Sequence, residues 1–103
     1  FIGRNTGANS NRVWLTGGNT RWITRDLFVG SNGSFNALVL SNGAQVFSRA
    51  GNIGFGASSA SNTVVVTGAG SLWTNNVMIA PLLVGGSGGG NRLVISAGGR
   101  VDD

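Results

Sequence analysis

Hydrophobic and polar residues alternate along this chain in short runs, and the same run occurs four times. Each run begins with an asparagine and follows the pattern N-x-[VL]-x-[VLI]-[ST], in which the core-facing positions are aliphatic. Alternation of this kind over about five residues predicts a β-strand with one face toward a core. The inward residues of the four runs are Val13 and Leu15, Leu38 and Leu40, Val64 and Val66, and Leu93 and Ile95.

The runs belong to a larger repeated unit, which opens with an aliphatic residue and a glycine and closes with a glycine or alanine turn and another short strand. The units begin at Ile2-Gly3, Val29-Gly30, Ile53-Gly54 and Val84-Gly85. An offset of 51 positions superimposes Trp22 on Trp73, and an offset of 55 superimposes Val46 on Val101. Two kinds of unit therefore alternate, with an insertion within residues 74–81. A period of roughly 20 to 30 residues is typical of stacked repeats.

Each unit contains three extended segments, for example residues 27–29, 36–41 and 45–48. A single coil cannot bury its apolar side chains, whereas stacked coils let each strand pair in parallel with its equivalent about 4.8 Å away. The sequence therefore predicts an all-β chain folded as a parallel β-solenoid, with about four coils of roughly 25 residues and three short strands each.

We expect residues 1–103 to form one solenoid segment, with coils at about 1–26, 27–51, 52–81 and 82–103. Arrays of repeats need dissimilar end units to cover their open ends, and none is evident here. The segment is therefore expected to be a section of a longer repeat array. It contains no run of apolar residues long enough to predict insertion into a membrane.

Four asparagines occupy one position of the repeat, namely Asn11, Asn36, Asn62 and Asn91. Stacked at strand spacing, their amides can bond to the copies above and below and form a ladder. The alternative is that asparagine merely tolerates the turn conformation before each strand. We favour the ladder, and both interpretations give these residues a structural role.

A second column is apolar although strand alternation directs it outward, and it consists of Trp14, Val39, Val65 and Val94. One interpretation is β-propensity on a partly exposed face. The other is a lateral contact surface, covered by another chain or by another part of the same protein.

The composition includes 19 glycines and one proline, and no cysteine, histidine, glutamate or lysine. Seven arginines against three aspartates give a net charge of +4. The arginines are dispersed singly, without an aromatic platform between them, which favours solvated outer positions over a nucleic-acid site. A weak attraction to acidic polysaccharide is the alternative.

Residues with common catalytic chemistry are scarce. Without histidine, cysteine or glutamate the usual transition-metal ligands are missing. Asp26 is expected about three coils away from Asp102 and Asp103, so no pair of carboxylates for sugar cleavage is predicted. The glycine-rich run at 85–90 lacks the lysine and helix of a phosphate loop. We therefore predict no enzyme activity and no catalytic, cofactor or metal site.

The units I-G-x(n)-N-x-V-x-V-T-G-x-G-S-x-W and L-x-V-G-x(n)-N-x-L-x-I-S-x-G-G-x-V resemble the autotransporter-associated β-strand repeats and related passenger-type β-helices of large bacterial surface proteins. Residues 53–54, 62–68, 71–73, 82–85 and 91–101 carry the resemblance. The first two units follow it more loosely, with Arg21 where the later copy has Leu72. The resemblance implies a right-handed solenoid and export to the cell surface or beyond, as a stalk or fibre.

The leading hypothesis is a structural repeat module of an extracellular or cell-surface bacterial protein, acting without catalysis as a stalk, adhesin or filament-forming fibre. Its partners would be neighbouring repeats or other copies of the protein, with surface polysaccharide as a further candidate. One alternative is a carbohydrate-binding or polysaccharide-degrading β-helix. Another is a self-assembling fibre of the functional-amyloid type, in which identical chains rather than successive coils stack.

Overall fold

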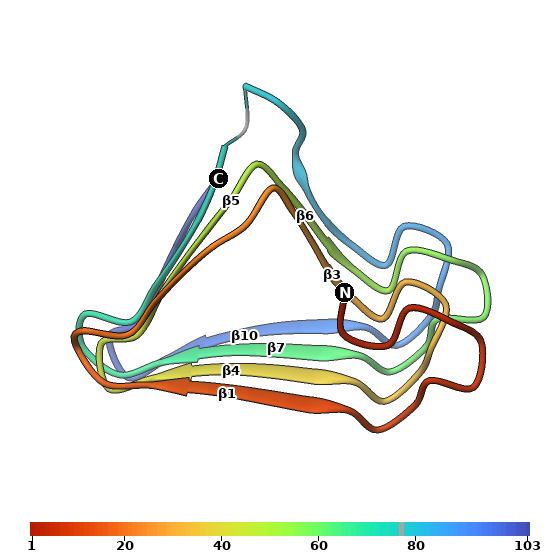
Figure 1. Cartoon of the computed structure of the whole chain (residues 1–103), viewed down its shortest axis with the longest axis horizontal. Coiled ribbons are helices and arrows are strands. Elements are labelled where there is room, and N and C mark those ends of the chain that lie inside the picture. The colour runs from red at the N-terminus through yellow and green to blue at the C-terminus, as the bar shows by residue number, and fades with distance from the viewer. Residues whose placement is uncertain (77) are drawn as a thin grey trace.

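The computed structural model describes residues 1–76 and 78–103, and this part of the chain consists of strands, turns and loops without a helix. Within it, no helical segment exists that is long and apolar enough to cross a membrane. Figure 1 shows the chain winding repeatedly around a triangular outline, with equivalent strands lying over one another. The shortest dimension of the molecule, 19 Å, is the one along which the coils stack.

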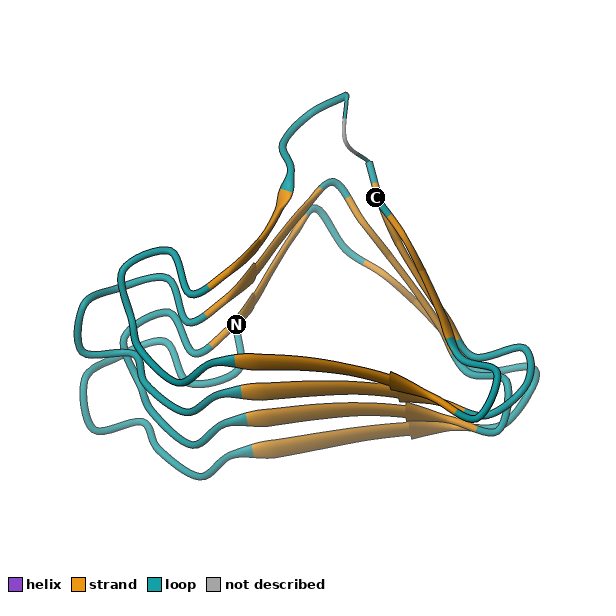
Figure 2. Ribbon diagram, turned by 180° about the vertical axis from the view of Figure 1, so that it is seen from behind, coloured by secondary structure: helices purple, strands orange, loops and turns teal. Residues whose placement is uncertain are grey.

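Three parallel sheets form the sides of the triangle (Figure 2). The first sheet contains β1 (Arg12–Thr16), β4 (Ala37–Ser41), β7 (Thr63–Thr67) and β10 (Arg92–Ser96) in that order. The second sheet contains β2 (Arg21–Ile23), β5 (Gln45–Ser48), β8 (Leu72–Asn75) and β11 (Arg100–Asp102). The third sheet contains β3 (Asp26–Val29), β6 (Ala50–Ile53) and β9 (Leu82–Val84).

Equivalent residues of successive units lie opposite one another in the sheets. The column of the first sheet runs through Val13, Leu38, Val64 and Leu93. The column of the second sheet runs through Trp22, Val46, Trp73 and Val101. The prediction of an all-β, parallel, stacked solenoid is confirmed by this register. The first segment of the first unit is shorter than predicted, because Ile2 forms an isolated bridge to Val29 instead of a strand.

The inward side chains of the three sheets meet in one apolar core. Those without solvent exposure include Leu27, Leu38, Leu40, Ile53 and Trp73. The Trp73 indole lies against Gly51, where an added Cβ would come within 2.7 Å of the ring. Its Nε1 donates to the Ser48 hydroxyl at 2.9 Å, so the polar atom of this buried ring is paired. Large and small residues therefore alternate where the second and third sheets meet.

The residue before each repeated asparagine adopts a left-handed backbone. The φ angles are 60° at Ser10, 59° at Phe35, 57° at Ser61 and 69° at Gly90. This conformation turns the loop into the strand of the first sheet. Because it falls on the preceding residue, tolerance of an unusual turn does not explain the asparagine itself.

Phe35 holds this left-handed conformation with its ring 64% exposed, so the strain at its Cβ is offset by little packing. We expect Phe35→Gly to raise the free energy of unfolding by about 1 kcal/mol, because glycine adopts positive φ without a steric cost. Urea denaturation followed by circular dichroism measures the change. Phe35→Ala is the matched control, since it removes the ring but keeps the strained Cβ. Equal stability of the two variants would contradict this account.

Candidate functional site

The four repeated asparagines form a ladder of amides at the entrance to the first sheet. Asn36 Oδ1 accepts hydrogen bonds from both the backbone N–H and the side-chain amide of Asn11, each at 2.9 Å. Asn36 donates in the same way to Asn62 Oδ1, at 2.9 and 3.1 Å. Asn62 donates to Asn91 Oδ1, at 2.9 and 3.0 Å. Each amide oxygen thus pairs two donors of the neighbouring coil that would otherwise be left without a partner.

The middle of the ladder is enclosed, with Asn36 1% exposed and Asn62 fully buried. Ser59 bonds to two members of the ladder: its hydroxyl accepts from Asn62 Nδ2 at 3.0 Å, and its carbonyl accepts from Asn91 Nδ2 at 3.0 Å. The same hydroxyl donates to the carbonyl of Gly30. Within residues 1–76 and 78–103, every buried side-chain nitrogen and oxygen has a hydrogen-bond partner. The geometry gives the asparagines a structural role.

The repeated glycines make room for this ladder. Gly30 has a φ of 76°, and a Cβ added to it would overlap the side-chain amide of Asn62 in the next coil. Gly54 stands in the same relation to Asn91. Gly85 has a similar φ of 73°, yet a Cβ there would meet no asparagine. The aliphatic–glycine pair of one unit and the asparagine of the next are therefore one contact.

The predicted outward column lies along the outer face of the first sheet. Its members, placed side by side by the strand register, are Trp14, Val39, Val65 and Val94. Trp14 is 63% exposed and the three valines are half-buried. The indole is held on the surface, because Nε1 donates to the Ser41 hydroxyl at 3.0 Å and the Arg12 guanidinium lies 5.6 Å from the ring centroid. This apolar row, with serine and threonine residues beside it, offers a contact surface without reactive groups.

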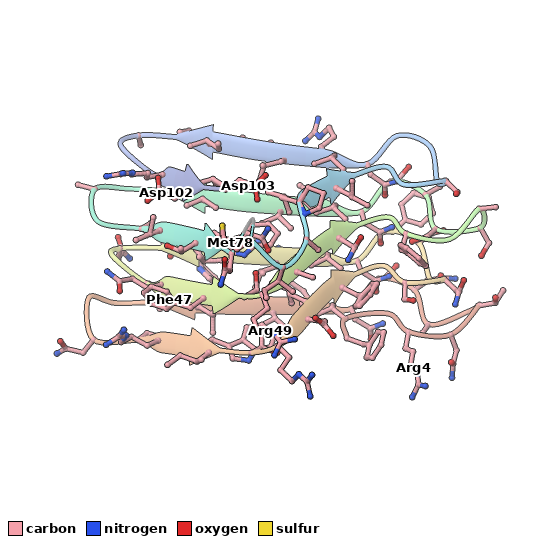
Figure 3. All side chains as sticks on the ribbon, turned by 90° about the horizontal axis from the view of Figure 1, so that it is seen from above. Arg4, Phe47, Arg49, Met78, Asp102 and Asp103 are labelled. Carbon is pink, nitrogen blue, oxygen red and sulfur yellow. The ribbon has the colours of Figure 1, made fainter. Side chains whose placement is uncertain are left out.

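A groove of about 650 Å³ lies over the second sheet, at the corner where the chain turns toward the third sheet. Its walls repeat three adjacent positions at and just beyond the ends of β2, β5 and β8: Ile23, Thr24 and Arg25; Phe47, Ser48 and Arg49; Thr74, Asn75 and Asn76. Figure 3 shows Phe47 and Arg49 on the side of the solenoid that faces the viewer. This site was not predicted from the sequence.

Two arginines become neighbours at the rim of the groove. The backbone N–H of Arg49 donates to the carbonyl of Arg25 at 2.7 Å. These two arginines, which are dispersed in the sequence, lie at equivalent positions of adjacent coils, because their separation in the sequence equals the length of one coil. The sequence does contain a signal for this groove: Ile23 and Phe47 are separated by 24 positions, and so are Arg25 and Arg49.

Asp26 lies apart from Asp102 and Asp103, which are consecutive in the sequence. Asp102 forms an ion pair with Arg100 at 2.6 Å, and Asp103 accepts from the side-chain amide of Asn75 at 2.7 Å. Asp26 begins β3 on the third sheet. In the described ranges no three histidine, cysteine, aspartate or glutamate residues gather into a cluster suited to a metal ion. The groove presents cationic, apolar and hydrogen-bonding groups.

The contact between glycine and the next asparagine gives a matched pair of substitutions. We expect Gly30→Ala to lower the free energy of unfolding by about 3 kcal/mol, because it adds backbone strain to a clash with the Asn62 amide. Gly85→Ala should cost only about 1 kcal/mol, since it adds similar backbone strain and its Cβ would meet the Gly88 carbonyl oxygen at 3.1 Å instead of overlapping an asparagine. Chemical denaturation of both variants measures the difference. Equal losses would show that the asparagine contact does not limit the glycine position.

Comparison with known proteins finds no matching family model, no similar curated protein and no similar solved structure. The functional evidence in this chain is consequently its own geometry. It consists of a fully paired amide ladder, an outward apolar row on the first sheet and a basic groove over the second.

Proposed function

We propose that this chain is a structural module, a four-coil segment of a right-handed β-solenoid. It serves as a stalk, adhesin segment or filament-forming fibre in an extracellular or cell-surface bacterial protein. The observation that carries the proposal is the register, in which equivalent positions of successive units pair in parallel in all three sheets. A chain held together in this way keeps its cross-section and lengthens along one axis as coils are added.

The coil count and the handedness have separate support. Each of the four sequence units contributes one strand to the first sheet, which supports a count of four coils. Parallel strands joined by crossover connections are right-handed in about 98% of cases, because the twist of the strands favours that return path.

Export is supported by the sequence. The chain has no cysteine, which is common among proteins exported across a bacterial envelope. Residues 62–73 and 91–101 carry the resemblance to autotransporter-associated β-strand repeats, which implies a location on the cell surface or beyond.

A non-catalytic role is supported by the use that the chain makes of its polar groups. The buried asparagines bond to one another, Asp102 pairs with Arg100, and Asp103 accepts from Asn75. These arrangements stabilise a shape. A fibre or stalk needs that shape to be stable and repeatable.

The stalk proposal is tested by joining two copies of residues 1–103 through the tripeptide Arg-Ala-Gly, which copies residues 49–51 and keeps the register of the third sheet. We expect one cooperative unfolding transition with a denaturant slope about twice that of the single copy. Small-angle scattering should show an increase in length close to the 19 Å stacking dimension. The control carries Trp14→Pro in the second copy, which disrupts its β1. Independent unfolding at the midpoint of the single copy would contradict the proposal.

The apolar row on the first sheet provides the surface for lateral association in a fibre. We expect Trp14→Lys combined with Val65→Lys to abolish lateral assembly without unfolding the coil, because the charges lie on an outward face. Analytical ultracentrifugation measures assembly, and circular dichroism measures the fold. Asn5→Lys with Asn19→Lys is the control, since it adds the same charge in exposed loops. Assembly that persists in the first variant would remove this surface from the proposal.

A further inference from the structure

The groove over the second sheet follows the axis of the solenoid. Its three levels occupy equivalent positions at the ends of β2, β5 and β8, so each position recurs at about 4.8 Å, the spacing between paired strands. A site with this translational repeat is suited to a linear polymer that lies along the axis. A compact ligand would fill one level only.

The floor of the groove is apolar at two of these levels. Ile23 is 73% exposed, and Phe47 lies opposite it on the neighbouring strand. The Arg21 guanidinium lies 4.9 Å from the centroid of the Phe47 ring and covers one side of it. Thr74 takes the equivalent place on β8, so the outward position tolerates both apolar and polar residues.

The rim of the groove carries unbalanced positive charge. Arg25 and Arg49 are exposed neighbours in adjacent coils, and like charges side by side are destabilising. In the described part of the chain the single ion pair joins Arg100 to Asp102, so neither rim guanidinium has a carboxylate within 4 Å. Anionic groups spaced along a polymer would relieve this repulsion.

The third level of the groove supplies hydrogen-bonding groups in place of charge. Asn75 is buried and bonded to Ser48 and Asp103, which fixes the wall. Asn76 is exposed, and its Oδ1 accepts from the backbone N–H of Met78, which leaves the side-chain NH₂ directed to other acceptors. Hydroxyl-rich ligands match such a level.

We propose that this groove binds an acidic polysaccharide, with the uronate carboxylates on Arg25 and Arg49 and the apolar face of a sugar ring on Ile23 and Phe47. Charge complementarity, the repeat along the axis and the mixed apolar and hydrogen-bonding walls all favour this occupant. The inference extends the proposed function by naming a ligand for the outer surface of the stalk. It depends on the stacked coils and is independent of lateral assembly.

Titration of the full chain with a short oligogalacturonate at physiological salt tests the proposal. We expect saturable binding, with the largest nuclear magnetic resonance shifts at the Ile23 methyl groups and the Phe47 ring. A neutral malto-oligosaccharide of equal length should bind far more weakly. Absence of oligogalacturonate binding, or equal binding of the two oligosaccharides, would overturn the proposal. Binding to anionic lipid vesicles without binding to the oligogalacturonate would also overturn it.

Two variants locate the site. Arg25→Gln with Arg49→Gln should weaken the affinity by about tenfold or more, since charged hydrogen bonds are lost. Phe47→Thr, which introduces the residue that the next coil carries at Thr74, should weaken it without changing the net charge. The control is Arg12→Gln with Arg92→Gln, which removes the same charge from exposed, equivalent positions on the first sheet. Equal losses in both arginine pairs would overturn the site in favour of non-specific attraction.

The fold of these variants separates this inference from the proposed function. The Arg25→Gln and Arg49→Gln pair should unfold at the same temperature as the parent chain or at a higher one, because it removes a repulsion. The binding proposal is supported if this variant binds the oligogalacturonate more weakly but still folds, and its tandem still unfolds cooperatively. If the tandem unfolds cooperatively but does not bind the oligogalacturonate, the stalk proposal stands and the binding proposal for the groove is overturned.

Discussion

The structure depends on one constraint, which is that every strand lies one hydrogen-bonding step from its equivalent in the next coil. The side chains of the asparagine ladder obey the same constraint, because they bond from one coil to the next. Asn62 Oδ1 accepts two donors of Asn36, and this works only when the coils are in register and at strand spacing. A slip by one residue would turn each inward side chain outward and would leave the buried amides unpaired. Backbone pairing and side-chain pairing therefore enforce the same register.

The glycines show how one unit restricts the next. Gly30 combines a left-handed backbone with close approach of the Asn62 amide, so two separate constraints each favour a glycine at this position. This coupling joins positions that are far apart in the sequence. A repeat protein of this kind is stabilised by contacts between neighbouring units, and each unit carries both halves of the contact.

The three sides of the solenoid differ in what they present to solvent. The outer face of the first sheet carries an apolar row, in which the Trp14 ring is fixed by its hydrogen bond to Ser41. The second sheet carries a groove with a pair of arginines at its rim. Stacking normally favours residues that tolerate copies of themselves above and below. Arg25 and Arg49 depart from this rule, because like charges repel, and this departure is one of the observations behind the proposed anionic ligand.

The sequence by itself determined the repeat, the strands and the inward columns, because alternation of apolar residues and the spacing of Asn36 and Asn62 report local geometry directly. The tertiary structure alone decided that the left-handed turn falls on Phe35 and its equivalents, since backbone conformation is not visible in residue type when the residue is a phenylalanine. It also decided that Arg25 and Arg49 lie at equivalent positions of adjacent coils. Their proximity arises from the length of one coil, and dispersed residues become neighbours only when the coils stack.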